Sequence, residues 1–296
     1  FARAFFAQPE NMSMAELMKG FHFYFLSNDK GIVYDVLDRD FQISFIDYCI
    51  KFLEKNKAQI HLNTAVKQLN YSNNKFLVNG NEFDYCVVCS DVNGTKKIFE
   101  NASGFEKFPT LNQQTQGLKN SGNYAVLRLW TDRFEQDKSL PFFIFTDRLK
   151  CLDSVTLYHR MEKESTAWSE VNNGGIFELH SYAVPEGMDK ATCYKELLQE
   201  LYHYFPELKD MEIKHEYYQF RNDFSAFHPG LYKSRPTVKT EVEGLYFAGD
   251  WVKMDNCSML MEGAFVSGAL AANYILSQEG LQEKQLVQVP TKGIFA

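Results

Sequence analysis

One stretch near the carboxyl end constrains the fold more than any other part of the chain. Residues 244–251 are Gly-Leu-Tyr-Phe-Ala-Gly-Asp-Trp, a pattern typical of a short apolar strand that ends in a glycine turn with one carboxylate. Residues 261–268 are Met-Glu-Gly-Ala-Phe-Val-Ser-Gly and predict a helix. The exposed face of this helix is expected to consist of small residues: Gly263, Ser267, Gly268 and Ala271. The sequence therefore predicts a strand–turn–helix unit.

The residue types in this unit suit a bound flavin. A glycine at the end of a strand lets a ligand approach the backbone closely. A carboxylate beside it can accept hydrogen bonds from sugar-like hydroxyls, and the start of a helix presents unpaired N–H groups to an anion. These are the requirements of the ribityl, pyrophosphate and isoalloxazine regions of a flavin. An ordinary strand–loop–helix unit without a ligand is the alternative.

The same residues carry a family resemblance. The run 244–251, with Met-Glu-Gly-Ala-x-x-Ser-Gly-x-x-Ala-Ala over residues 261–272, resembles the C-terminal FAD motif of the flavin amine oxidase and phytoene desaturase superfamily. An aspartate and Trp251 after the Ala-Gly pair are more similar to carotenoid desaturases, since amine oxidases more often have glutamate there. The opening residues 1–7 and 12–17 are similar to the middle of carotene desaturases of the isorenieratene-synthase type.

The resemblance implies FAD as the cofactor and assigns residues of the turn to it. Asp250 is expected to accept a hydrogen bond from a ribityl or nearby hydroxyl, with Gly249 allowing the close approach. Trp251 is expected to stack near the flavin or to line a substrate tunnel. An exposed turn aspartate is the alternative for Asp250.

The helix that follows has a predicted role of its own. Met261, Glu262, Gly263 and Ala264 open it, and their backbone N–H groups are expected to meet the flavin N1–C2=O edge, which gains negative charge on reduction. The side chain of Glu262 is expected to cap the helix. By the resemblance, the backbone of Val66 lies against the adenine.

A glycine motif expected elsewhere in such proteins does not occur in this sequence. The superfamily binds the FAD diphosphate with a Gly-x-Gly-x-x-Gly turn in its first strand–helix unit, and this spacing is absent here. We therefore expect the chain to be the C-terminal portion of a longer enzyme, with the nucleotide-binding half upstream. The alternative is a truncated or partner-dependent chain that is not catalytic by itself.

Composition excludes some function classes. A formal net charge of −7 offers no basic patch for nucleic acid. The six cysteines are scattered, and Cys86-x-x-Cys89 has no second pair to complete a zinc site, so no metal is expected and reduced thiols of a cytoplasmic protein are the simpler interpretation. The nearly apolar stretch 257–276 contains Glu262 and Asn273 and predicts a buried helix instead of a transmembrane span.

The predicted fold class is α/β (α+β overall): the C-terminal parts of a Rossmann-like FAD-binding domain, with an inserted antiparallel-sheet substrate domain. The expected segments are residues 1–37 (a helical lid), 38–107 and 226–280 (FAD-binding), 108–225 (substrate-binding) and 281–296 (tail).

Local patterns predict the elements inside these segments. A helix is expected over 12–26, with Ser13 and Glu16 forming a capping box, and a second over 41–56. A strand is expected over 58–69, then a hairpin at Ser72–Asn74 and Asn79-Gly80, and a parallel-type strand at Val87 and Val88. Alternating runs at 124–130, 142–145, 154–158 and 176–182, a helix at 189–204 and a strand at 213–220 predict the antiparallel sheet.

The expected activity is the desaturation of an apolar polyene such as a carotenoid. No acid–base pair can be read from spacing, which fits a reaction in which the flavin removes the hydride. Such a substrate implies a peripheral membrane contact and an aromatic tunnel formed in part by residues 12–26 and 108–222. The 26 Phe and 16 Tyr fit this tunnel or a biased genome composition. A flavin amine oxidase is the alternative, and Arg235 is expected to neutralise Asp250 or a phosphate, or to be an ordinary surface arginine.

Overall fold

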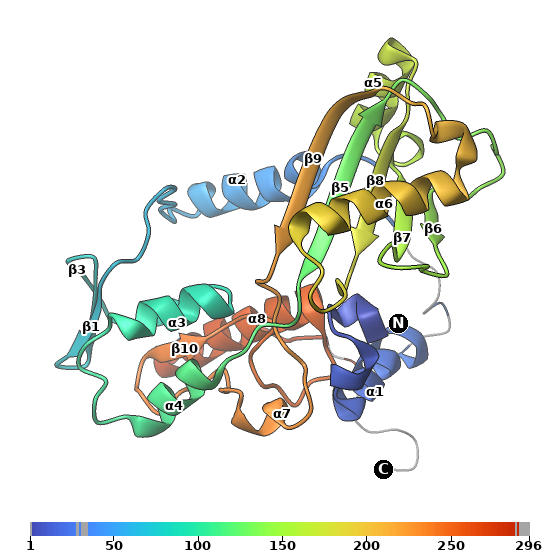
Figure 1. Cartoon of the computed structure of the whole chain (residues 1–296). Coiled ribbons are helices and arrows are strands. Elements are labelled where there is room, and N and C mark those ends of the chain that lie inside the picture. The colour runs from blue at the N-terminus through green and yellow to red at the C-terminus, as the bar shows by residue number, and fades with distance from the viewer. Residues whose placement is uncertain (1, 28–29, 31–34, 288, 290–296) are drawn as a thin grey trace. The chain divides into compact units, whose positions relative to one another are not determined.

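A computed structural model describes residues 2–27, 30, 35–287 and 289 of the chain (Figure 1). It divides into two compact units, each with its own hydrophobic core. Unit 1 contains the described residues of 1–33, 64–121 and 223–296, and unit 2 contains those of 34–63 and 122–222. In the part of the chain that is described, no helix is both long and apolar enough to cross a membrane.

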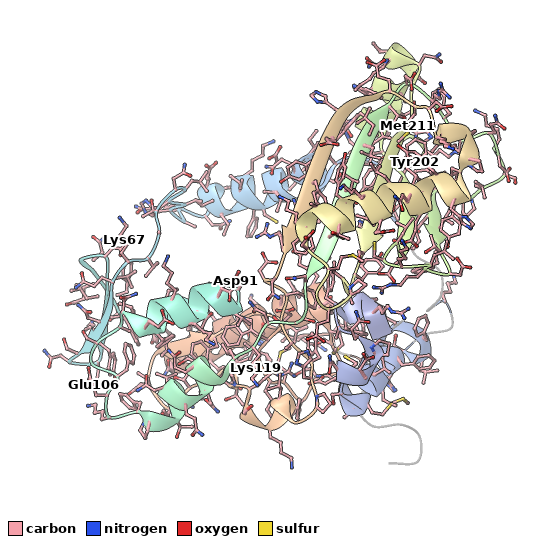
Figure 2. The ribbon with its side chains drawn as sticks, in the orientation of Figure 1. Lys67, Asp91, Glu106, Lys119, Tyr202 and Met211 are labelled. Carbon is pink, nitrogen blue, oxygen red and sulfur yellow. The ribbon has the colours of Figure 1, made fainter. Side chains whose placement is uncertain are left out.

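Unit 1 is built around a short parallel strand pair. Strand β4 (Cys86–Val88) pairs with β10 (Leu245–Phe247) in parallel, in register from Leu245↔Cys86 to Phe247↔Val88, which confirms the parallel strand predicted at Val87 and Val88. Helices α3 (Val92–Glu100), α4 (Pro109–Gly117) and α8 (Leu260–Gln278) contribute to one core with these strands. Asp91 begins α3, where its carboxylate accepts from Gly94 N (Figure 2).

A three-stranded meander joins this core. Strands β1 (Leu69–Ser72), β2 (Lys75–Val78) and β3 (Asn81–Phe83) pair antiparallel in that order. The predicted turns are confirmed: Asn73, Asn74 and Asn79 have positive φ, which asparagine tolerates better than most residues. The strand predicted over 58–69 is wrong, because only Leu69 belongs to a strand and 58–68 is irregular.

The amino-terminal part of unit 1 is helical. Two short 3₁₀ turns, Ala2–Phe5 and Pro9–Asn11, precede α1 (Met14–Phe21), and a π-helical turn covers His22–Leu26. The helix predicted over 12–26 is thus confirmed in its main part. The predicted capping box is wrong: Ser13 precedes α1 but makes no side-chain capping bond, and Glu16 binds elsewhere. Short α7 (Leu231–Ser234) lies between the last strand of unit 2 and β10.

Unit 2 contains a five-stranded antiparallel sheet, as predicted. Its order is β6-β7-β8-β5-β9, formed by β6 (Phe143–Phe145), β7 (Ser154–Leu157), β8 (Ile176–Ser181), β5 (Tyr124–Thr131) and β9 (Ile213–Arg221). Helix α6 (Lys190–Tyr204) covers one face of the sheet and contacts β5 and β8 (Figure 1). Tyr202 of α6 and Met211 pack at the margin of the resulting core (Figure 2).

Shorter elements complete unit 2. They are the π-helical turn Gln42–Ile46 that leads into α2 (Asp47–Lys55), the 3₁₀ turns Tyr158–Arg160 and Pro206–Leu208, and α5 (Lys163–Asn172). The predicted helix over 41–56 is confirmed. Its apolar side chains are exposed, however, including Phe45, Tyr48 and Phe52 at half to two thirds of their surface.

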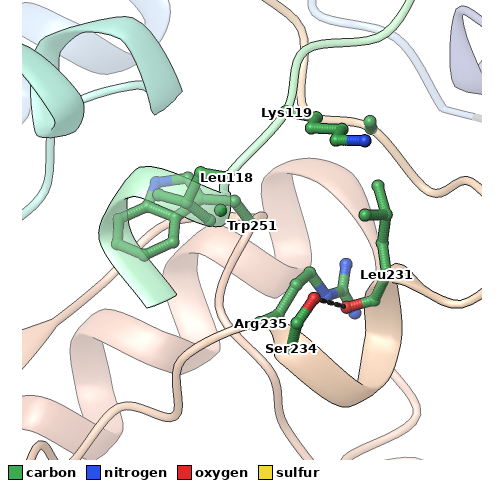
Figure 3. A pocket seen from close by; sticks show the side chains of 8 residues that line it. Leu118, Lys119, Leu231, Ser234, Arg235 and Trp251 are labelled. Carbon is green, nitrogen blue, oxygen red and sulfur yellow. Dashed lines mark hydrogen bonds between the residues drawn. The ribbon is translucent and has the colours of Figure 1, made fainter. Parts of the chain in front are cut away.

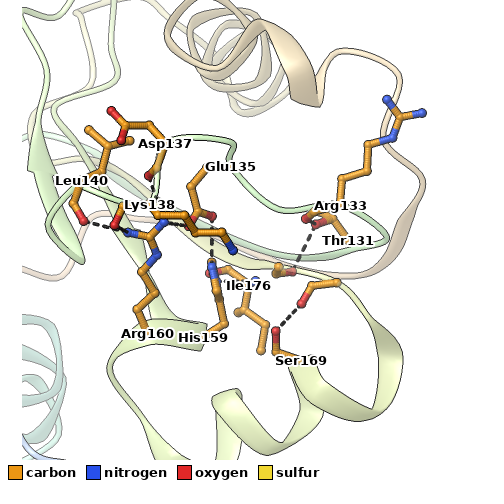
Figure 4. A network of polar contacts seen from close by, with 12 residues as sticks. Thr131, Arg133, Glu135, Asp137, Lys138, Leu140, His159, Arg160, Ser169 and Ile176 are labelled. Carbon is orange, nitrogen blue, oxygen red and sulfur yellow. Dashed lines mark hydrogen bonds and ion pairs between the residues drawn. The ribbon is translucent and has the colours of Figure 1, made fainter.

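A buried polar network fixes one end of the sheet (Figure 4). His159 Nε2 lies 3.0 Å from Glu135 Oε2, and Arg160 pairs with the other oxygen of the same carboxylate. The second ring nitrogen, His159 Nδ1, meets the backbone of Ile176. Since both side chains of the His159–Glu135 pair are almost completely buried and their polar atoms are bonded, this network stabilises the fold.

Candidate functional site

The turn after β10 is held to α8 by one serine. Gly249 has φ +144°, a conformation that L side chains rarely adopt, and its N–H donates to Ser267 Oγ at 2.8 Å. Ser267 Oγ in turn donates to Ala264 O at 2.8 Å, within α8. A Cβ on Gly249 would lie 2.5 Å from Trp251 Nε1. The turn therefore needs glycine for both its backbone and its packing.

Asp250 follows Gly249 and presents a partly buried carboxylate. Ser225 Oγ donates to its Oδ1 at 2.7 Å. Desolvation raises the pKa of Asp250 above its usual range, and the hydrogen bond from Ser225 and the charge of Arg235 only partly oppose this. Such a carboxylate is stabilised by any further hydrogen-bond donor that reaches it, and a ligand hydroxyl is such a donor.

Trp251 belongs to the core of unit 1. Its side chain is 1% exposed, its Nε1 donates to Ser90 O at 3.0 Å, and its ring lies 5.3 Å from that of Phe247. Ser90 follows the carboxyl end of β4, so the indole ties the ends of the two parallel strands together. Ala248 N also donates to Val88 O at 3.0 Å. The turns after β4 and β10 thus lie at one edge of the parallel pair, the edge at which open α/β sheets bind ligands.

The amino end of α8 lies 10 residues beyond Asp250 in sequence and has no side-chain cap. Met259 precedes the helix, Leu260 has φ +54°, and Gly263 N already bonds Met259 O at 3.1 Å. Met261 and Glu262 are exposed, Gly263 is buried and Ala264 is partly buried. A Cβ on Gly263 would make only ordinary contacts, the nearest at 3.7 Å to Ser258 O, so packing in this chain does not demand glycine there.

The small-residue face of α8 does not face solvent. Ser267 and Ala271 are 0% exposed and Gly263 is buried, so the prediction of an exposed small-residue face is wrong. The reason is that small side chains also allow a helix to pack closely against a strand, and α8 contacts β10.

Arg235 forms its ion pair with Glu16 and not with Asp250, although its positive charge still lowers the pKa of Asp250. Its guanidinium is 7% exposed and its Nη2 pairs with Glu16 Oε1 of α1 at 2.6 Å, which rules out an ordinary surface arginine. Its Nε and Nη1 have no hydrogen-bond partner, and the rings of Phe227 and Tyr232 lie 5.2 and 5.4 Å from it. Arg235 also lines a cavity of about 10 Å³, room for about one water molecule (Figure 3).

Val66 lies in an irregular segment, outside the described helices and strands. It is 41% exposed, and the irregular segment around it is held by Asn79, whose side chain bonds Ala65 O, Lys67 N and Gln68 N. The adenine contact remains a prediction, as do the cofactor contacts of Gly249, Asp250, Trp251 and residues 261–264.

The sequence did not predict the roles that three residues have in this region. Ser225 and Glu16 lie 25 and 234 positions from Asp250, and only the fold brings Ser225 to it and Glu16 to Arg235. Ser267 was noted only as a small residue. No local pattern in the sequence signals a hydroxyl that accepts from a distant backbone N–H.

The residues present fit a flavin. The region combines a desolvated carboxylate, a glycine turn at the carboxyl end of a parallel pair, and an uncapped helix of 19 residues. In the described part of this chain, no group of three or more His, Cys, Asp or Glu side chains could hold a metal ion.

Comparison with known proteins agrees with this chemistry. Residues 4–276 match the model of the flavin containing amine oxidoreductase family. The carotenoid phi-ring synthase of Chlorobaculum tepidum is 35% identical over 244 residues, covering 78% of this chain and 36% of that protein. The protein of the same name from Streptomyces griseus is 30% identical over 300 residues, covering 99% of this chain and 57% of that protein. The chain therefore spans about a third to somewhat over half the length of these relatives.

Solved structures share the fold at low identity. Reduced UDP-galactopyranose mutase matches with a TM-score of 0.55 and 10% identity, over 78% of this chain and 50% of that one. A putative protoporphyrinogen oxidase from an Exiguobacterium species matches with a TM-score of 0.53 and 14% identity, over 79% and 51%. The predicted fold class, an α/β FAD-binding fold with an antiparallel sheet, is confirmed.

Proposed function

Because the chain belongs to the flavin containing amine oxidoreductase family, whose cofactor is FAD, we propose that it is the C-terminal portion of an FAD-dependent enzyme that removes hydrogen across C–C bonds of an apolar polyene. In this proposal unit 1 supplies the carboxyl-terminal segments of the FAD site. The sheet of unit 2 supplies the substrate-binding part, near the boundaries expected from the sequence, 108–225.

One observation carries the cofactor half of the proposal. Gly249 and Asp250 lie at the carboxyl end of the parallel pair, and Ser267 ties this turn to α8, whose amino end has no side-chain cap. In a bound state Asp250 would accept from a ribityl hydroxyl. Since Gly263 N already bonds Met259 O, the N–H groups of Met261 and Glu262 at the start of α8 would face the flavin N1–C2=O edge and favour its reduced form.

The substrate class rests on the relatives. Both are named carotenoid phi-ring synthases, and a carotenoid is an apolar polyene. The flavin would accept the hydride, so the chain itself needs to orient the substrate, exclude water and receive a proton. Access to such a substrate from a bilayer implies a peripheral membrane contact of a cytoplasmic protein.

The name of the family also refers to amines, so the oxidation of an amine is the second candidate reaction. The two activities differ in what the bound flavin responds to. A primary or secondary amine would reduce the flavin of an amine oxidase, whereas a carotenoid would reduce that of a desaturase.

The test uses the protein with its upstream sequence restored. We expect it to purify with a flavin absorbance band between about 350 and 500 nm, and anaerobic β-carotene in detergent micelles to bleach that band. Benzylamine under the same conditions is expected to leave the band unchanged. Bleaching by the amine and not by the carotenoid would overturn the proposed substrate class, and the absence of flavin would overturn the cofactor assignment.

A further inference from the structure

Helix α2 and the residues that lead into it expose one apolar face. The large side chains of this face recur at helical spacing, and each is exposed over 42% to 69% of its surface. They are Phe41, Phe45, Tyr48, Phe52 and Leu53. From Phe45 to Leu53 they line an open groove together with Ser44 and Cys49. A surface helix normally turns such a stripe toward a core, so this face is an interaction surface.

Polar contacts fix the start of this helical segment to α5. Lys163 N donates to Asp38 O at 2.9 Å, and Arg39 Nε donates to Glu164 Oε1 at 2.8 Å. Asp40 N donates to the other oxygen of Glu164 at 3.2 Å. These contacts determine where the helical segment begins, whereas the apolar face beyond them remains exposed.

A tight turn joins the end of α2 to the segment that follows. Ala58 N donates to Leu53 O at 3.0 Å, and Lys57 N donates to Glu54 O at 2.9 Å. Lys57 has φ +64°, so the turn is a Schellman motif, which ends a helix and gives the chain a new direction. Helix α2 and the segment after it are therefore connected in the way that a helix is connected to the next strand of a sheet.

This segment has the residue pattern of a strand but no strand beside it. Ile60 and Leu62 stand at alternate positions and are exposed over 41% and 77% of their surface. No described strand pairs with residues 59–61. A strand needs a neighbouring strand, and a helix next to it in sequence covers a face of the sheet to which the strand belongs. The helix face and the strand pattern therefore require the same partner, a sheet with a free edge.

A protein partner fits this surface better than a bilayer does. The edge of a sheet offers hydrogen bonds to the backbone of residues 59–61, whereas the hydrocarbon of a bilayer offers none. The relatives supply the reason to look for the sheet in the same polypeptide. They are longer than this chain, which covers 36% and 57% of their length, and the proposed function requires a nucleotide-binding half upstream.

We propose that the apolar face of α2 and residues 59–61 dock onto a sheet formed by the upstream part of the same polypeptide. In this arrangement residues 59–61 add a strand at the edge of that sheet, and α2 covers the adjoining face. The inference rests on the proposed function, because only that function requires the upstream part. It agrees with the sequence-based assignment of residues 38–107 to the FAD-binding part.

The first test identifies what covers the helix. Tyr48→p-benzoylphenylalanine places a photo-reactive group on the apolar face, at a position that is 69% exposed. The protein with its upstream sequence restored is irradiated in the presence of phosphatidylcholine–phosphatidylglycerol vesicles. We expect a cross-link within one polypeptide, to a peptide that precedes Phe1. A cross-link to lipid or to a second copy would overturn the proposal, and so would the absence of any cross-link.

The matched control is the same replacement at Val171. This side chain is also apolar and is 85% exposed, but it lies on α5, outside the proposed docking surface. Val171→p-benzoylphenylalanine is expected to give no cross-link to the upstream part. An equal cross-link from both positions would show that the reaction does not depend on the face of α2, and would overturn the proposal.

The second test reads the proposed strand directly. In the protein with its upstream sequence restored, hydrogen exchange at the amides of residues 59–61 is expected to be slowed by about a hundredfold or more relative to the irregular residues 285–287, because strands inside a sheet exchange only when it opens. Equally fast exchange in both segments would contradict the added strand.

The outcomes separate this inference from the proposed function, because neither test requires bound flavin or a carotenoid. A longer protein that shows the cross-link and the slow exchange but binds no flavin would contradict the proposed cofactor and leave the docking surface intact. A flavin-containing protein without the cross-link or the slow exchange would overturn this inference alone.

Discussion

The backbone N–H of Gly249 donates to the hydroxyl of Ser267, 18 residues later, at 2.8 Å. This bond joins the turn that bears Asp250 to the helix that begins at Leu260, so the two parts of the candidate flavin site are positioned by one buried side chain.

Replacement of Ser267 by alanine tests this coupling. Ser267→Ala removes the acceptor and leaves the Gly249 N–H unpaired, which costs about 1–3 kcal/mol of unfolding free energy. Flavin retention is expected to fall with it, because the turn is no longer held. Chemical denaturation and flavin content measure the two effects. Ser277→Ala, an exposed serine of the same helix, should change neither.

The ionised carboxylate of Asp250 is predicted to lower the stability of the flavin-free protein. Its pKa in the folded protein lies above the unfolded value, so its contribution to stability is present at low pH and is lost as pH rises through the folded pKa. Asp250→Asn should therefore make the flavin-free protein more stable at neutral pH, with the gain shrinking toward acid. Thermal unfolding of both proteins, measured from acid to neutral pH, would show this gain in stability. A gain that is largest at acid pH would contradict the raised pKa of Asp250.

The same Asp250→Asn variant is expected to bind flavin more weakly. Hydrogen bonds to a charged acceptor contribute about 1.5–3 kcal/mol, which corresponds to a loss of roughly tenfold or more in affinity. The release of flavin from each protein during dialysis, followed by flavin fluorescence, measures this difference in affinity. Equal affinity would mean that Asp250 makes no flavin contact.

A further prediction concerns the buried Glu16–Arg235 pair. Arg235→Met leaves the Glu16 carboxylate without its partner inside the protein and should cost about 3–5 kcal/mol, whereas the double variant Glu16→Leu/Arg235→Met should cost clearly less. Denaturant unfolding of the single and double variants gives the comparison. Additive losses would show that the two side chains are not coupled in this way.

Trp251 supplies a prediction about the strand ends. Trp251→Phe loses the hydrogen bond to Ser90 O and part of the buried ring, for a cost of about 2 kcal/mol. Trp168→Phe, at a partly buried position in unit 2, is the matched control and should cost less. Equal losses would contradict the role of Trp251 in joining β4 to β10.

Patterns local in sequence predicted most of the fold. Period-two alternation identified the strands of the antiparallel sheet, and Asn-Gly at 79–80 identified a turn, because each signal depends on neighbours along the chain. The prediction of a capping box at Ser13 and Glu16 is wrong because Glu16 pairs with the buried guanidinium of Arg235, 219 residues away.

Two other failures have the same origin. The alternation of Ile60, Leu62 and Val66 resembles a strand, but a strand requires a partner, and no described strand pairs with 58–68. The small residues of α8 were expected to face solvent, although the packing of α8 against β10 buries most of them. The hydrogen bonds that join Arg128, Glu178 and His180 could not be predicted either, since only strand register brings β5 and β8 together.

The flavin content of Asp250→Ala tests the central claim most directly. The protein with its upstream sequence restored should purify with flavin, and Asp250→Ala should lose most of it while unfolding cooperatively. Asp255→Ala, an exposed aspartate of the same loop, should keep its flavin. Equal flavin-to-protein ratios in all three proteins would contradict the assignment of the cofactor to this turn.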